Sequence, residues 1–238
     1  MTGPVSGSAR ARYAVYWAPP ATSALARFGA HWLGRDAETG ATPAPDPTWG
    51  AASWHAAVTA EPRRYGLHAT LKPPFRLAIG RPPGELVAAL AAVAAATAPV
   101  VGPALVLRRL GRFLALVPDG PAPAVQALAA RLVADLDDFR APPDAAELAR
   151  RRAHTLSPAH EANLVRWGYP YVMDEFRFHV TLSGALDAPT LDRLEALLRP
   201  LVAPFTTGPL TLDDIALFEQ PDADAPFRLT QRFPLGGG

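Results

Sequence analysis

Residues 66–75 read Gly-Leu-His-Ala-Thr-Leu-Lys-Pro-Pro-Phe, a run in which polar and apolar side chains alternate. In an extended strand, successive side chains point to opposite faces. We therefore expect His68, Thr70 and Lys72 on one face of a strand, with the apolar residues between them on the other. One face can then pack into a core, while the other carries groups capable of chemistry.

The same pattern returns far downstream, where residues 176–184 read Phe-Arg-Phe-His-Val-Thr-Leu-Ser-Gly. Alternation places Arg177, His179, Thr181 and Ser183 on one face of this second strand. Two strands that share the form His-x-Thr-Leu, each backed by hydrophobic residues, indicate a site built from two halves of a duplicated unit.

Composition indicates a globular protein and excludes several classes. The chain has 238 residues, of which 49% are hydrophobic and 19% charged, so it can bury a sizeable core. A formal net charge of +1 gives no sign of nonspecific nucleic-acid or membrane binding. The absence of cysteine excludes disulfides and thiolate nucleophiles and fits a reducing cytoplasm, where we expect the protein.

No targeting or membrane-spanning segment is expected. Residues 1–11 are small and polar, and we expect a disordered tail there. The Ala-rich run over residues 86–97 is apolar but too short to cross a bilayer.

Apolar periodicity and turn residues predict the order of elements along the chain. Besides the two motif strands, strands are expected over residues 12–17, 104–110, 112–117, 204–211, 214–219 and 227–233. Helices are expected over residues 22–33, 49–58, 85–97, 124–136 and 189–198.

This order predicts an α+β fold of two pseudo-symmetric lobes, each an antiparallel sheet with helices on its outer face, with an active-site groove between them. We place the N-terminal lobe at residues 12–136 and the C-terminal lobe at residues 172–238, with one motif in each. Residues 137–171, which contain a proline pair and three consecutive arginines, are expected to form a helical insertion or linker.

The two motif histidines differ from the other four. His31, His55, His154 and His160 are predicted to be surface or packing residues. His68 and His179 each lie between apolar neighbours, where a titratable ring is costly unless it has a use. If they face one another, one can take a proton from an attacking oxygen and the other can give one to a leaving oxygen at phosphorus. The hydroxyls of Thr70 and Thr181 can donate to the nonbridging oxygens.

Other chemistries find little support in the sequence. No pair of histidines has metal-ligand spacing on a helix, and the only acidic residues beside either motif are Asp174 and Glu175, so no metal is expected. A Gly-x-Ser-x-Gly elbow, a P-loop and a Gly-x-Gly-x-x-Gly fingerprint are all absent.

With their flanks, residues 64–75 and 167–182 resemble the 2H phosphoesterase superfamily, in the branch encoded beside carbon-phosphorus lyase genes and labelled as phosphonate-metabolism proteins. The resemblance implies a cyclic phosphodiesterase that needs no metal or other cofactor. It implies that His68 and His179 form the acid-base pair and that Thr70 and Thr181 hold phosphate oxygens. It also implies a substrate, the 1,2-cyclic phosphate of ribose 5-phosphate, which would open to a ribose bisphosphate.

A small sugar with a second phosphate would need a further anion pocket. The candidates for substrate binding are Lys72, Arg177 and Tyr65, followed by Arg64, residues 150–152, Tyr169 and Tyr171. Lys72 is the only lysine in the chain, which indicates either a specific need for an ammonium group or chance. For the arginines at residues 150–152, a solvated helix face is the alternative.

Two other functions remain open at this stage. RNA ends that carry 2′,3′-cyclic phosphates could be the substrate, and nucleic acid would then be a partner. The near-neutral net charge does not favour this alternative. A catalytically inactive binder of a phosphorylated metabolite is the other alternative. The sequence assigns neither the base among the two histidines nor the oligomeric state.

Overall fold

A computed structural model describes residues 11–153 and 155–237. Most of the tail expected over residues 1–11, and the prediction for His154, therefore lie outside the described residues. Ala11, which we expected to end the tail, is buried against the core.

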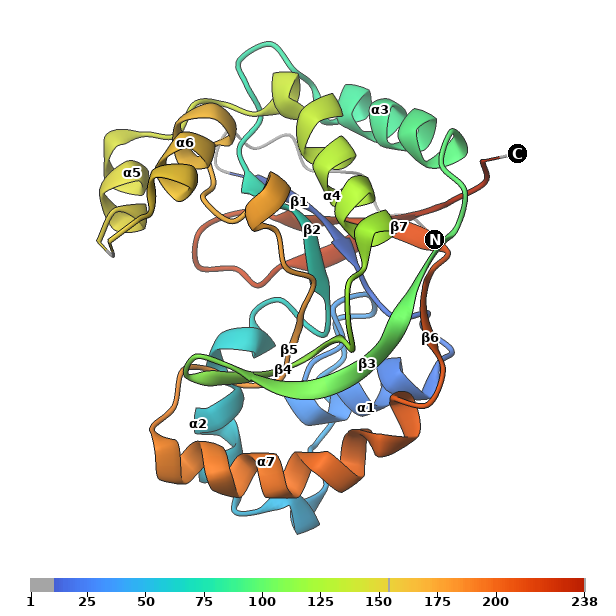
Figure 1. Ribbon diagram of the computed structural model, residues 1–238, viewed down its shortest axis with the longest axis vertical. Helices are drawn as coiled ribbons and strands as arrows, with labels where there is room; N and C mark the ends of the chain where they lie inside the picture. Colours follow the sequence, from blue (N-terminus) through green and yellow to red (C-terminus); the bar gives the residue numbers. More distant parts are fainter. Residues whose placement is uncertain (1–10, 154, 238) are drawn as a thin grey trace.

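The strands form a single eight-stranded sheet in which every neighbouring pair is antiparallel, in the order β6-β3-β4-β5-β2-β1-β7-β8 (Figure 1). Their bounds are β1 Arg12–Trp17, β2 Ala69–Phe75, β3 Val100–Leu110, β4 Phe113–Pro118, β5 Val180–Thr181, β6 Pro209–Leu212, β7 Asp214–Gln220 and β8 Arg228–Pro234. The predicted α+β class with antiparallel pairing is confirmed.

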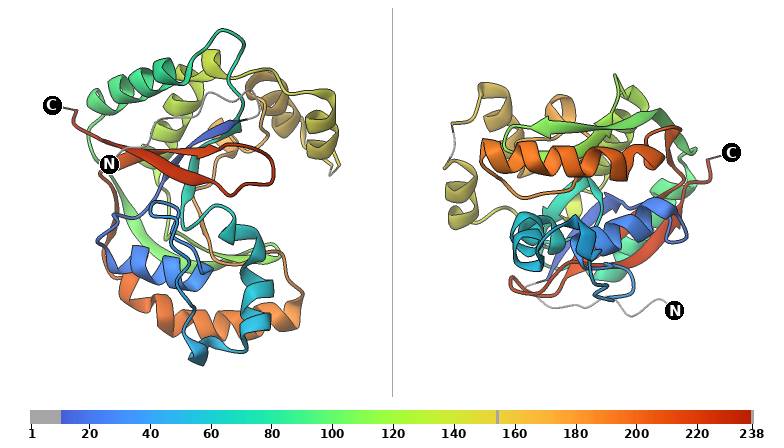
Figure 2. Two further views of the ribbon diagram at one scale, coloured as in Figure 1. Left: turned by 180° about the vertical axis from the view of Figure 1, so that it is seen from behind. Right: turned by 90° about the horizontal axis from the view of Figure 1, so that it is seen from below.

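The α-helices are α1 Ala24–Leu33, α2 Ala52–Arg63, α3 Pro83–Ala95, α4 Pro123–Asp135, α5 Ala145–Arg151, α6 Pro158–Trp167 and α7 Ala188–Val202. Short 3₁₀ helices occupy Pro47–Trp49, Asp137–Phe139, Met173–Glu175 and Ala203–Phe205. Two groups of helices flank the sheet: α3 and α4 lie on one side of the molecule and α1, α2 and α7 on the other (Figures 1 and 2). Helices α5 and α6 project beside the first group (Figure 1).

The two halves of the sheet each combine strands from both ends of the chain. One half consists of β1, β2, β7 and β8, and the other of β3, β4, β5 and β6. The halves meet where β2 pairs with β5. The threonine of each motif lies in its strand, and His68 and His179 each lie directly before it. The division of the chain at residues 136 and 171 stays a prediction. Each half of the sheet contains strands that precede residue 136 and strands that follow residue 171.

Local sequence signals explain where several helices begin and end. The backbone N–H of Ala26 donates to the side-chain oxygen of Ser23, which caps α1, and Gly34 ends that helix with a left-handed conformation. Helix α6 begins after Ser157 and ends at Gly168 in the same way. These caps satisfy backbone groups that a helix end otherwise leaves without partners.

The second motif strand is shorter than predicted. We expected an extended strand over residues 176–184, but only Val180 and Thr181 pair as β5. The chain reaches this strand from the 3₁₀ helix Met173–Glu175, and beyond it the carbonyl of Leu182 accepts the indole N–H of Trp32 at 2.8 Å. The 3₁₀ helix before the strand and the hydrogen bond from Trp32 after it therefore accompany the short β pairing at Val180 and Thr181.

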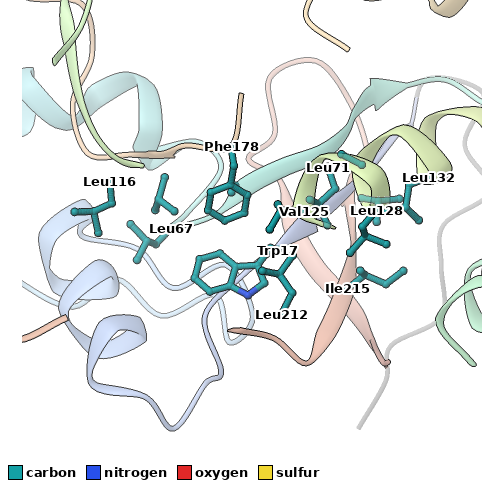
Figure 3. Close-up of a cluster of buried hydrophobic side chains, with 14 of the residues drawn as sticks. Trp17, Leu67, Leu71, Leu116, Val125, Leu128, Leu132, Phe178, Leu212 and Ile215 are labelled. Atoms are coloured by element: carbon teal, nitrogen blue, oxygen red, sulfur yellow. The ribbon is translucent and has the colours of Figure 1, made fainter. Parts of the chain in front are cut away.

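Both motif strands are anchored in one hydrophobic core. Figure 3 shows Leu71 from β2 near the α4 side chains Val125, Leu128 and Leu132, while Phe178 lies near Trp17. Full burial of each such side chain contributes about 1.5–3 kcal/mol. The apolar face of each motif therefore holds the opposite, polar face in place.

Candidate active site

The site is built on the pairing of Ala69 in β2 with Val180 in β5. Both side chains are fully buried in the core, so their sequence neighbours point away from it. Continuing the antiparallel register by one residue places His68 beside Thr181, and Thr70 beside His179. Directly opposite residues of an antiparallel pair have Cβ atoms about 4.5–5.5 Å apart. The two imidazoles and two hydroxyls thus form one compact cluster.

All four of these side chains line one cavity of about 690 Å³. The remaining walls come from β1, from the end of α2, from α5 and from residues 169–171. His68 and His179, predicted to meet across a shared pocket, do so. Tyr65, predicted as a substrate-binding residue, also lines this cavity.

Each motif imidazole makes the same local hydrogen bond. Nδ1 of His68 lies 2.9 Å from the carbonyl oxygen of Gly66, and Nδ1 of His179 lies 2.7 Å from that of Arg177. Because a carbonyl oxygen can only accept, Nδ1 donates in both cases. Nε2 of each ring is left to exchange protons with a ligand.

Aromatic rings surround His68. Its imidazole stacks on Tyr16 with ring centroids 4.1 Å apart, and Tyr65 lies at 5.5 Å. Burial is the main cause that lowers the pKa of His68 to about 4; the hydrogen bond to Gly66 opposes this shift and the nearby His179 adds to it. His68 is therefore neutral at pH 7.

Tyr16 is a site residue that the sequence analysis missed. It pairs with Thr70 across β1 and β2, and both side chains line the cavity. Burial raises the pKa of Tyr16, so its hydroxyl stays protonated. Alternation along residues 12–17 puts Arg12 and Tyr16 on one face, but only the pairing of β1 with β2 reveals what that face contacts.

Lys72 does not share a face with His68 and Thr70, contrary to the prediction. The register between β1 and β2 shifts twice, pairing Tyr16 with Thr70 but Val15 with Lys72. Such a bulge inserts an extra residue into one strand and interrupts its alternation. Lys72 is buried, and its ammonium donates to the carbonyl of Val133 on α4 at 3.1 Å. Burial lowers the pKa of Lys72 to about 8.

Arg177 and Ser183 also lie away from the cluster. Arg177 is exposed and lines a different cavity, of about 280 Å³, together with Phe176 and Gln126. The shared face predicted for Arg177 does not hold, because Arg177 lies three residues before the paired strand begins at Val180. Ser183 is buried, and its hydroxyl accepts the backbone N–H of Leu114 at 3.0 Å.

Of the other candidate cations and aromatics, Arg64, Arg150, Arg151, Tyr169 and Tyr171 line the cavity, and Arg12 joins them. Arg152 does not, because its guanidinium pairs with Glu161. The insertion predicted over residues 137–171 therefore supplies a wall of the site.

The remaining described histidines have structural positions, as predicted. His31 is exposed and its Nδ1 donates to the carbonyl of Ala44, His55 packs against Trp32, and His160 lies 2.9 Å from Glu175. Within residues 11–153 and 155–237, no group of three or more His, Cys, Asp or Glu side chains could hold a metal ion. No helix in the same ranges is both long and apolar enough to span a membrane.

Comparison with solved structures finds distant likenesses. The chain is 16% identical to Escherichia coli LigT complexed with 3′-AMP, with 95% of this chain and 98% of that chain covered and a TM-score of 0.42. A second structure, described as a phosphoesterase, is 16% identical over the same shares of the two chains, with a TM-score of 0.44. At these values the likenesses support no conclusion about activity.

Comparison with curated proteins finds closer relatives. The chain is 37% identical over 241 residues to a protein of Janthinobacterium sp. (strain Marseille) named "Ribose 1,5-bisphosphate phosphokinase PhnN". That match covers 98% of this chain and 52% of the relative. A protein of the same name from Laribacter hongkongensis (strain HLHK9) is 38% identical, with 92% of this chain and 50% of the relative covered. The chain thus spans about half the length of these relatives.

A family model described as "Protein of unknown function (DUF1045)" matches residues 70–228. The match contains the whole second motif, and it starts two residues after His68, at Thr70 of the first. Because it covers more than half of the chain, the chain belongs to the DUF1045 family.

Proposed function

We propose that this protein is a cyclic phosphodiesterase in which His68 and His179 act as a general base and a general acid. The observation that carries this proposal is the pairing of Ala69 with Val180, because it sets one His-x-Thr element directly beside the other. A phosphoryl group bound at the cluster would have an imidazole and a hydroxyl available from each strand. This is the arrangement that an in-line displacement at phosphorus requires.

In the proposed reaction, a water oxygen attacks phosphorus while the base removes one of its protons. The bond from phosphorus to one ring oxygen breaks, and the acid gives its proton to that oxygen. The product is a phosphomonoester with a free hydroxyl. Thr70 and Thr181 donate to the nonbridging oxygens and stabilise the charge that develops on them.

The environments of the two rings support an assignment of their roles. A pKa of about 4 leaves His68 neutral at pH 7, with Nε2 able to accept a proton. We therefore assign His68 as the base and His179 as the acid.

For the substrate, we propose a ribose 1,2-cyclic phosphate that carries a 5-phosphate. Hydrolysis of its bond between phosphorus and O2 gives ribose 1,5-bisphosphate, the compound in the names of the two curated relatives. The two relatives are named as kinases, but this chain has no P-loop motif. We therefore do not expect it to be a kinase of the P-loop type.

The test is hydrolysis of that cyclic compound by the purified protein, followed by phosphorus NMR. We expect turnover that is insensitive to a chelator. His68→Ala and His179→Ala should each lower kcat by about 10²–10⁴-fold with the fold intact. His31→Ala, at an exposed histidine outside the cavity, is the matched control. Undiminished turnover in either active-site variant would refute the proposal, and tight binding with no turnover over many hours would indicate a binding protein.

Nucleotides with a 2′,3′-cyclic phosphate are the second candidate substrate. The aromatic rings of Tyr65, Tyr169 and Tyr171 in the cavity wall favour it, since bases stack on such rings. A higher kcat/KM for a cyclic-ended oligonucleotide than for the cyclic sugar phosphate would select this substrate.

A further inference from the structure

We propose that Arg64, Arg150 and Arg151 form a second anion subsite in this cavity, which binds a phosphate group remote from the one being opened. This inference rests on the proposed function and narrows its substrate class to small cyclic phosphodiesters that carry a second phosphate. Arg150 and Arg151 come from α5, and Arg64 follows α2. All three line the cavity that contains the two motif histidines.

These three arginines line the cavity of the two histidines, whereas Lys72 and Arg177, the cations of the two motifs, do not. Lys72 is turned toward α4 by the bulge in β2, and Arg177 lies on another cavity. Neither lines the cavity of the His-Thr cluster. A second phosphate in this cavity therefore meets guanidinium groups rather than the ammonium of Lys72.

The charge in this cavity is only partly compensated. Its walls include the carboxylates of Glu61 and Glu147, and Glu147 is occupied by Arg151 at 3.0 Å. Arg64 donates to a backbone carbonyl, that of Ala223, and the guanidinium of Arg150 has no hydrogen bond or ion pair with any residue in the described ranges. Among the described residues, the guanidiniums of Arg64 and Arg150 thus form no ion pair at contact distance, although Arg150 is close enough to Asp144 to help lower the pKa of that carboxyl.

Arg151 supplies a second, independent observation. Its Nε is buried and has no hydrogen-bond partner within the described part of the chain. A buried N–H without a partner is unfavourable, so the hydrogen bond to Glu147 leaves part of the donor capacity of this guanidinium unused. The guanidinium also lies 4.5 Å from the ring centroid of Tyr169, which holds its plane at the cavity wall.

Helix α5 is held in place by the strand that carries the first motif. Arg76, which follows β2, pairs with Asp144 at 3.1 Å and approaches Glu147 at 3.8 Å. Asp144 also caps the helix by accepting the N–H of Glu147 at 2.8 Å. These ion pairs place the start of α5, the helix that carries Arg150 and Arg151, beside the end of β2.

The chemistry selects the class of ligand. Guanidinium groups bind phosphate through paired, charge-assisted hydrogen bonds, which are stronger than neutral ones. A phosphomonoester carries nearly two negative charges at pH 7. The subsite therefore favours a sugar phosphate with a terminal monoester over a substrate whose only phosphate is the cyclic one.

The experiment compares ribose 1,2-cyclic phosphate with and without a 5-phosphate in Arg64→Gln, Arg150→Gln, Arg151→Gln and the double variant of Arg150 and Arg151. We expect the double variant to lower kcat/KM for the 5-phosphorylated substrate about 10–100-fold, mainly through KM, from the strength of charge-assisted hydrogen bonds. Turnover of the substrate without that phosphate should change by less than about threefold. Arg152→Gln is the matched control, because Arg152 is the C-cap of the same helix but pairs with Glu161 outside the cavity.

Calorimetry with ribose 5-phosphate separates the failure of this inference from the failure of the proposed function, because that probe needs no turnover. We expect the double variant to weaken its binding about tenfold or more, while Arg152→Gln leaves it unchanged. Equal losses for both cyclic substrates, or unchanged binding of ribose 5-phosphate, would overturn the subsite. If ribose 5-phosphate binding depends on the arginines but neither cyclic compound is hydrolysed, the subsite stands and the catalytic proposal fails.

Discussion

The ring of Tyr16 lies stacked on the imidazole of His68, with centroids 4.1 Å apart and planes inclined by 28°. Tyr16 is also the residue of β1 that pairs with Thr70, so one residue of β1 lies beside both polar groups of the first motif. The stack removes one face of the imidazole from water, which disfavours its charged form. Tyr16 is thus a positioning residue whose influence on His68 can be measured.

Replacement of Tyr16 should separate these two contacts. Tyr16→Phe keeps the stacked ring and should leave the low pKa of His68 nearly unchanged, whereas Tyr16→Leu exposes the imidazole and should raise that pKa toward 6.5. NMR titration of His68 in the three proteins measures the shift. A pKa unaffected by Tyr16→Leu would show that other neighbours bury the ring.

Stability should fall as the pH is lowered from 6.5 toward 4. In this interval the unfolded protein binds a proton at His68 that the folded protein excludes, because the folded pKa is about 4. The free energy of unfolding then decreases with falling pH by up to about 1.4 kcal/mol per pH unit for one such group. Urea unfolding at several pH values measures this slope.

His68→Gln should flatten that slope. A residual dependence is expected because burial also lowers the pKa of His55. An identical slope in the variant would mean that His68 takes up its proton as readily in the folded state as in the unfolded one.

The roles of the two histidines predict different responses to the leaving group. With a p-nitrophenyl phosphodiester of ribose 5-phosphate, the phenolate leaves without protonation, so an acid is not needed. The defect of His179→Ala should therefore shrink at least about tenfold relative to the cyclic substrate, while that of His68→Ala should persist. Release of nitrophenolate gives the rates, and the opposite pattern would exchange the assigned roles.

Lys72→Met should leave catalysis intact, because the ammonium lies away from the cavity and contacts Val133. We expect kcat/KM within about threefold of the unmodified protein, and equal or higher stability at pH 7, since burying a charge is costly. The lowered pKa, about 8 instead of 10.5, means that the native protein gains stability as the pH rises through this interval. The stability advantage of Lys72→Met should therefore shrink by pH 10. A large loss of kcat/KM in this variant would show that Lys72 contributes to catalysis or substrate binding.

Much of the fold follows from local sequence signals. Residues 12–17 form β1 as predicted, and the helix expected over residues 124–136 is α4 shifted by one residue. The order of strands across the sheet could not be predicted, because it depends on contacts between distant segments. Element order predicts a repeated unit but not that β6, near the C-terminus, pairs with β3.

The candidate site shows the same division. Alternation within each motif predicts that His68, Thr70, His179 and Thr181 project from the polar face. Alternation fails at Lys72, because a bulge is set by the register with β1, which a single strand's sequence does not contain. Tyr16 and Arg12 enter the site through strand pairing alone, so no local pattern indicates them.

The strand β5 has consequences for how the protein reaches its native state. It comes late in the chain, yet it fills the centre of the sheet between β2 and β4. Contacts between such distant segments form slowly, because a long loop must close before they stabilise the chain. A nascent polypeptide that has emerged only through α6 holds the first histidine without its counterpart. If the paired motifs bind phosphate as proposed, this affinity should arise only once β5 has inserted between β2 and β4.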